Sequence, residues 1–72
     1  MRGNEFADWA DSLKKGDIVR IDHSGQLVRI TNFGLARVGV IVKPIFGGKN
    51  FTEPVINLMA PSPLELLAAQ AE

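Results

Sequence analysis

Four short runs of β-branched and aliphatic residues, separated by turn-forming residues, constrain the fold of this chain more than any other feature. Runs at residues 17–21, 27–31, 36–43 and 55–59 are predicted to be strands. Glycine, asparagine, aspartate and proline stand between the runs and favour turns. No connection is long enough for a parallel crossover. The pattern therefore predicts a mainly β domain, a small antiparallel barrel of four to five strands.

Alternation within these runs predicts which side chains form the core. One face is uniformly aliphatic, and its members are Val19, Ile21, Val28, Ile30, Val38, Val40 and Val42. On the opposite face, Ile18, Leu27 and Ile41 stand among basic residues. We expect these three aliphatic residues to contact a helix or a partner.

Residues 4–15 are predicted to form an N-terminal helix. Asn4 is a suitable N-cap, and Gly16 is a suitable residue to end the helix. Apolar residues recur with helical spacing and form one stripe: Phe6, Trp9, Ala10 and Leu13. This stripe must pack on the sheet or on a neighbouring chain.

Residues 62–71 are predicted to form a short C-terminal helical tail. Ser62, Pro63 and Glu65 have the types and spacing of a capping box with proline at the first helical position. One stripe contains Leu64, Leu67, Ala68 and Ala71. So short a helix is marginal in isolation and needs a docking surface, on its own chain or on another subunit. The whole chain, 1–72, is predicted to be a single domain, with the barrel at 16–60.

With 72 residues, the chain can bury only a small core. Domains of this size are commonly stabilised by disulfides, metals or oligomerisation. Cysteine is absent and there is one histidine, which excludes disulfides and multi-histidine metal sites. We therefore expect association with itself or with a partner. No apolar run approaches the roughly 20 residues of a membrane span, so we expect no membrane-spanning segment.

Charge is distributed unevenly although the net charge is zero. Residues 1–13 and 50–72 are acidic, whereas residues 14–49 carry seven basic residues and two acidic ones. The favoured interpretation is that acidic ends dock on a basic middle, within one chain or between copies. The alternative is a polyanion site. Its candidate contacts are Arg20, Arg29, Arg37, Lys43 and Lys49.

The sequence offers little support for catalysis. His23 is next to Asp22, which suggests a base and its orienting group, but no nucleophile or second acid stands at a recognisable spacing. Two adjacent donors do not make a closed metal site. The glycines of residues 47–50 lack the spacing of a phosphate-binding loop and are predicted to form a hairpin tip. We predict no catalytic residue, cofactor or metal.

Two resemblances bear on function. Lys15 to Ile21 and Gly39 to Val42 resemble the opening of KOW-type SH3-like barrels, which implies binding to RNA or to transcription and translation machinery. A second resemblance, to small SH3-like accessory proteins of tailed bacteriophages, covers about two-thirds of the chain. It rests on residues 14–21, 38–42, 55–58 and 64–66. This resemblance implies an SH3-like barrel with a structural or assembly role and a cytoplasmic or virion location.

The leading hypothesis is a non-catalytic structural or assembly module that binds protein partners, as a homo-oligomer or within a larger assembly such as a phage capsid or tail. Its expected contact residues are Phe6, Trp9, Leu13, Leu64 and Leu67. One alternative is an RNA- or DNA-binding barrel that uses the five basic residues. Another is a small inhibitor or adaptor that docks on a host protein.

Overall fold

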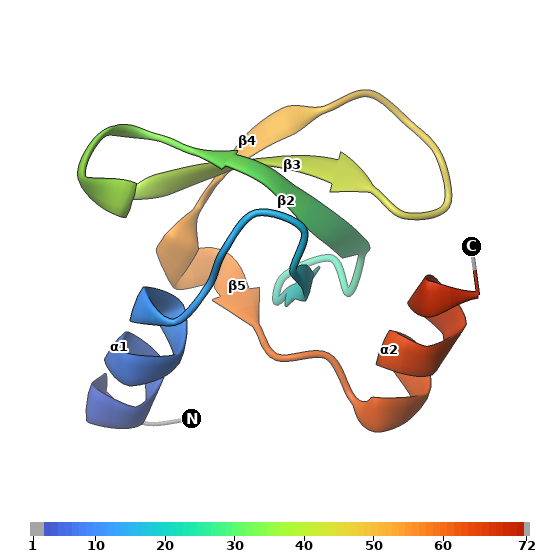
Figure 1. Cartoon of the computed structure of the whole chain (residues 1–72), viewed down its shortest axis with the longest axis horizontal. Coiled ribbons are helices and arrows are strands. Elements are labelled where there is room, and N and C mark those ends of the chain that lie inside the picture. Colours follow the sequence, from blue (N-terminus) through green and yellow to red (C-terminus); the bar gives the residue numbers. More distant parts are fainter. Residues whose placement is uncertain (1–2, 72) are drawn as a thin grey trace.

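Five strands form one antiparallel sheet in the order β4-β3-β2-β1-β5 (Figure 1). The computed structural model describes residues 3–71, with side chains from residue 5 onward. The strands are β1 (Ile18–Ile21), β2 (Leu27–Phe33), β3 (Gly39–Pro44), β4 (Phe51–Pro54) and β5 (Leu58–Met59). The helices are α1 (Gly3–Asp11) and α2 (Pro63–Gln70), and two 3-10 turns are η1 (Leu35–Arg37) and η2 (Val55–Asn57). Within residues 3–71, no helix has the length and apolar character that crossing a membrane requires.

The chain path forces the sheet to curl. Strands β4 and β5 lie at opposite edges of the sheet, yet only the three residues of η2 separate them in sequence. A flat sheet of five strands would place its edges about 19 Å apart, whereas three residues of 3-10 helix rise about 6 Å. The edges therefore approach each other, and the sheet forms a half-barrel (Figure 1). The predicted fold class, a small antiparallel barrel with a helix at each end, is confirmed.

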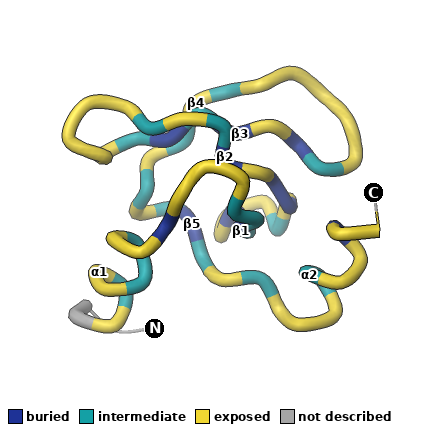
Figure 2. The backbone as a smooth tube through the Cα atoms, viewed as in Figure 1, coloured by how far each residue is buried: buried dark blue, intermediate teal, exposed yellow. Residues whose placement is uncertain are grey.

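The core lies inside this half-barrel. Six predicted core residues are at most 1% exposed, namely Val19, Ile21, Val28, Ile30, Val40 and Val42. Leu58 of β5 and Leu13, which follows α1, complete the cluster. In Figure 2 the buried positions follow the strands, while α2 is exposed over most of its length.

Val38 is the one predicted core residue that the structure places outside, with 70% of its surface exposed. The predicted strand 36–43 begins only at Gly39, because Leu35–Arg37 form η1. Ala36 and Arg37 both have left-handed backbone angles, with φ of 54° and 58°. These angles turn the chain sharply. Val38 therefore still has a helical conformation, and the alternation of the strand starts with the next residue, Gly39.

The predicted strand 55–59 is also corrected. Its first three residues form η2, and only Leu58 and Met59 pair with β1. Instead, Phe51–Pro54, predicted as part of a loop, pairs with β3. Pro54 is compatible with this strand because β4 is an edge strand, and proline lacks the N–H that a second neighbour would require.

Helix α1 ends at Asp11, four residues before the predicted end. The Ser12 hydroxyl donates to the Trp9 carbonyl (2.6 Å), and such side-chain bonds compete with continuation of the helix. Gly16 does not end the helix; its N–H donates to the Ile30 carbonyl beside the sheet. The helix begins at Gly3, so Asn4 lies inside it and is not the N-cap that the sequence predicts. Helix α2 begins as predicted, with both hydrogen bonds of the Ser62–Glu65 capping box present.

Candidate protein-binding surface at the terminal helices

The apolar stripe of α1 packs largely against the protein's own sheet. Leu13 is 6% exposed and belongs to the core cluster, and Trp9 is half-buried against that cluster. Phe6 is half-buried beside Trp9, with ring centroids 5.8 Å apart and planes tilted by 52°. Of these three predicted partner contacts, Phe6 and Trp9 therefore keep accessible surface, whereas Leu13 is used inside the fold.

Arg37 holds the C-terminal end of α1. Its guanidinium donates to the carbonyls of Leu13 and Ala10, which lie at that end, and it lies 3.9 Å over the Phe33 ring. A cation there satisfies free carbonyls and complements the negative end of the helix dipole. The left-handed turn of η1 delivers the side chain to this position. Sequence reasoning listed Arg37 only as a nucleic-acid contact and missed this role, because no local pattern links residues so far apart.

Helix α2 turns its predicted apolar stripe outward. Leu64 and Leu67 are 79% and 65% exposed, and Ala68 and Ala71 are exposed as well. The opposite side of the helix faces the sheet: Ala69 is fully buried, and Leu66 is half-buried. A large apolar stripe on a surface helix is a feature of protein-binding sites.

Polar contacts fix the first turn of α2. The Ser62 N–H donates to the Glu65 carboxylate (2.9 Å), and the Glu65 N–H donates to the Ser62 hydroxyl (3.1 Å). Arg20 of β1 pairs with the same carboxylate at 3.6 Å. The Ser62 N–H is the main cause that lowers the pKa of Glu65 below its usual value; the Ser62 hydroxyl and Arg20 add to this, while partial desolvation opposes it.

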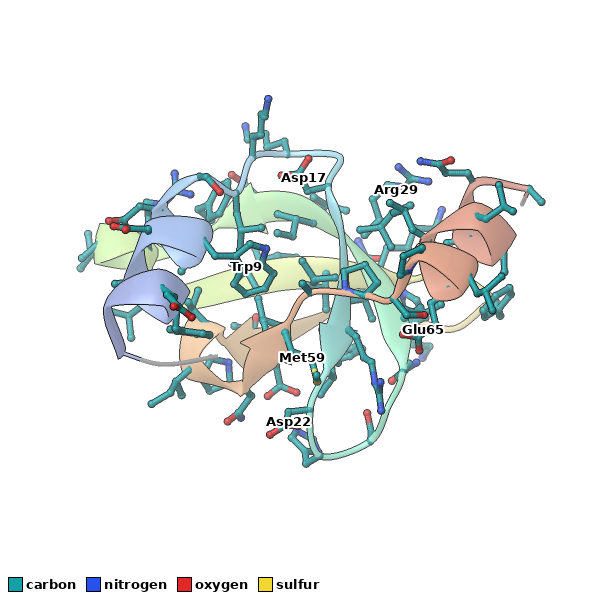
Figure 3. All side chains as sticks on the ribbon, turned by 90° about the horizontal axis from the view of Figure 1, so that it is seen from below. Trp9, Asp17, Asp22, Arg29, Met59 and Glu65 are labelled. Carbon is teal, nitrogen blue, oxygen red and sulfur yellow. The ribbon has the colours of Figure 1, made fainter. Side chains whose placement is uncertain are left out.

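A cleft of about 510 Å³ separates the two helices. Its walls come from α1, the start of β1, β2, the segment before α2, and α2 itself. Figure 3 looks toward this region, with Trp9 on the side of α1 and Arg29 and Glu65 on the side of α2. The cleft thus lies between the two groups of residues that were predicted to contact a partner.

Two of the five predicted nucleic-acid contacts are engaged by the terminal helices. Arg37 is engaged with α1 and Arg20 with Glu65. Arg29 and Lys43 are exposed and directly opposite each other on β2 and β3, and Lys49 lies in the loop between β3 and β4. Only the contact of Arg20 joins a basic residue of the middle to an acidic residue of a chain end, because Arg37 binds backbone carbonyls.

His23 has a partner that the sequence did not indicate. Its Nε2 lies 3.1 Å from a carboxylate oxygen of Glu53 on β4, and the Asn57 side-chain amide donates to the other oxygen (3.2 Å). The three residues connect the turn after β1 to the far edge strand, so they act as a polar link across the rim of the half-barrel. Among residues 3–71, no three His, Cys, Asp or Glu residues gather in a way that could hold a metal.

Comparison of this chain with protein-family models, with curated proteins and with solved structures finds no match.

Proposed function

We propose that this protein is a non-catalytic structural or assembly module that binds protein partners, as a homo-oligomer or as part of a larger assembly. The observation that carries the proposal is the outward stripe of α2, where Leu64 and Leu67 are 79% and 65% exposed. Helix α2 contacts its own sheet through the small side chain of Ala69 and through Leu66. A partner that covers both leucines would therefore complete the burial of this helix.

The polar contacts support this role because they hold α2 in place without using its leucines. The capping box and the Arg20–Glu65 pair fix the first turn. The leucines are consequently presented at a defined position, and binding them requires little further ordering of the helix. The resemblance to small accessory proteins of tailed bacteriophages extends the proposal to a virion component of the capsid or tail, with a cytoplasmic or virion location.

Sedimentation of the full chain across micromolar concentrations tests the proposal. We expect oligomers, or a stable complex with a co-purified partner, and we expect the double substitution Leu64→Glu with Leu67→Glu to abolish the association. Leu35→Glu is the matched control, because Leu35 is 95% exposed but lies in η1, away from α2. A chain that stays monomeric and recovers no partner, or an equal loss with Leu35→Glu, contradicts the proposal.

The RNA- or DNA-binding alternative depends on Arg29, Lys43 and Lys49, the basic candidates without an ion pair or helix contact described above. Phosphate contacts make affinity fall steeply as salt rises. Binding of a single-stranded oligonucleotide at low salt that disappears in Arg29→Gln and Lys43→Gln would favour this alternative over protein binding.

A further inference from the structure

A second cleft, of about 320 Å³, lies beside η2 and β5, and we call it the η2 cleft. Its lining residues are Phe6, Asp22, Ile56, Leu58, Met59 and Ala60, of which only Asp22 is charged. The apolar lining is accessible, since Ile56 is 78% exposed, Ala60 is exposed, and Phe6 and Met59 are half-buried. The η2 cleft is therefore a shallow surface on which apolar side chains of another molecule can pack.

The outward stripe of α2 has the pattern of a helix that binds in an apolar groove. Leu64, Leu67, Ala68 and Ala71 follow the spacing i, i+3, i+4 and i+7, which such helices use for their contact residues. All four are exposed. The two leucines supply the large contact residues, and the small alanines after them allow the helix to approach closely.

The stripe and the η2 cleft do not meet within one chain. The side of α2 that carries Ala69 is turned inward, so the two leucines face away from the rest of the chain. In Figure 3, Met59 and Asp22 mark the η2 cleft, and Glu65 marks α2 at a separate place to their right. Contact between the two surfaces therefore requires a second molecule.

The charges around the two surfaces are complementary. Asp22 lines the η2 cleft, and Glu5 and Asp8 are exposed on α1, the helix that forms one side of it. Arg29 and Lys43 are exposed and line a small cleft together with the buried alanine of α2. Within residues 3–71, none of these five side chains forms an ion pair. A copy that brings its α2 to the η2 cleft of another copy therefore brings basic residues toward acidic ones.

We propose that the stripe of α2 docks in the η2 cleft of a second copy of this chain, and that the second copy returns the same contact. Leu64 and Leu67 of each copy pack against Phe6, Ile56 and Met59 of the other. Both helices lie on the same side of the sheet, α1 at the left and α2 at the right of Figure 1. A half-turn between the copies thus exchanges the two surfaces and gives a two-fold dimer. This inference rests on the proposed protein-binding function and names the partner.

The symmetry explains how so short a helix can support a stable contact. Helix α2 has eight residues, and one such helix covers little of the roughly 1,200–2,000 Å² that stable interfaces bury. In the dimer, two copies of the contact form together. The second contact adds buried surface without a second loss of translational freedom.

Sedimentation of the full chain at micromolar concentrations should show a dimer. Ile56→Lys puts a charge on the exposed wall of the η2 cleft and should weaken dimerisation at least about tenfold, and Ala60→Lys should act similarly. Leu35→Lys is the matched control, because Leu35 is 95% exposed in the other 3-10 turn, and it should leave the dimer unchanged. Circular dichroism checks that each variant is folded. Higher salt should also weaken the dimer, since opposite charges face each other.

A mixture of two defective variants tests the reciprocal contact directly. Ile56→Lys keeps an intact stripe, and the double substitution Leu64→Glu with Leu67→Glu keeps an intact η2 cleft. Neither variant should dimerise alone. Their heterodimer retains one native contact, and in the other contact the new lysine meets the new glutamates. Native mass spectrometry of the mixture should therefore detect the heterodimer.

Four results would overturn this inference: a monomeric chain, an open series of larger oligomers, full dimerisation by Ile56→Lys and Ala60→Lys, or no heterodimer in the mixture. If one of them occurs while the double substitution of Leu64 and Leu67 still abolishes association with a co-purified partner or in another oligomer, the stripe binds a different surface and only the dimer is wrong. If that double substitution also changes nothing, the proposed protein-binding function fails as well.

Discussion

Helices α1 and α2 have nearly the same length, nine and eight residues, but they are attached to the sheet in different ways. Helix α1 leads into Leu13 in the core and is held at its C-terminal end by Arg37. Helix α2 is held at its N-terminal end by a capping box and an ion pair. One helix therefore depends on apolar burial, and the other depends on polar contacts that leave its leucines free.

Under the proposed function, the two helices have different roles. A helix whose apolar stripe is buried is part of the fold, so its substitution should affect global stability. A helix that is positioned by polar contacts and exposes its leucines is suited to binding, and it can open locally without unfolding the barrel. The following variants measure this contrast, beginning with the largest effect.

Leu13→Ala should lower the free energy of unfolding by about 2–4 kcal/mol, because it leaves a cavity in the core. Leu67→Ala removes the same number of atoms from the exposed stripe of α2 and should change the free energy by less than about 0.5 kcal/mol in the isolated chain. Urea denaturation followed by circular dichroism measures both. Similar losses in the two variants would show that α2 is as much a part of the core as α1.

Arg37→Gln should lower the free energy of unfolding by about 1–2 kcal/mol. The carbonyls of Leu13 and Ala10 lose a charged hydrogen-bond donor, and Phe33 loses the cation over its ring. Arg20→Gln is the matched change at α2, where an accessible ion pair contributes about 0–1 kcal/mol. Thermal or urea unfolding of both variants measures how much free energy of unfolding each one loses. An equal cost would mean that the contact between Arg37 and α1 adds nothing beyond an ordinary surface pair.

Arg37 also illustrates what could be predicted from the sequence. Alternation of Val19, Ile21, Val28 and Ile30 identified the core face, since each side chain's direction follows from its neighbours along the strand. The position of Arg37 depends on two left-handed residues in η1, at Ala36 and at Arg37 itself. Non-glycine residues rarely adopt this conformation, so the sequence gives no sign of it.

The candidate site could likewise be predicted only where local sequence signals determine it. The capping box at Ser62 is a local signal, and the structure contains it. Periodicity alone also identified the stripe of Leu64 and Leu67, but it could not tell which side of α2 meets the sheet. In the structure Ala69 is fully buried whereas Leu64 and Leu67 are exposed, so the side of α2 that carries Ala69 is turned inward. The cleft itself depends on where two distant helices lie and has no signature in either one.

Ser62→Ala should destabilise α2 by about 1 kcal/mol while the barrel remains folded, because the cap acts on the first turn of that helix. Ser12→Ala, at the end of α1, removes one hydroxyl bond to the Trp9 carbonyl and should have a smaller effect. Amide hydrogen exchange measures the local stability of each helix separately. Faster exchange throughout the barrel in Ser62→Ala would show that α2 cannot open independently.

Acid should loosen α2 before it affects the barrel. The pKa of Glu65 is lowered below its usual value of 4.5 in the folded protein, chiefly by the Ser62 N–H. Because the pKa of Glu65 is lower in the folded state, its ionised carboxylate stabilises the fold above pH 4.5. This stabilisation is lost as the pH falls through the folded pKa. NMR spectra recorded between about pH 6 and pH 3 should therefore show the α2 amides shifting with the Glu65 carboxyl while core amides such as Val28 stay fixed. Glu65→Gln should remove this pH dependence. If α2 still loosens in acid in this variant, Leu66 and Ala69 rather than the charged cap determine how the helix is attached. The contrast between the two helices would then be smaller than their contacts indicate.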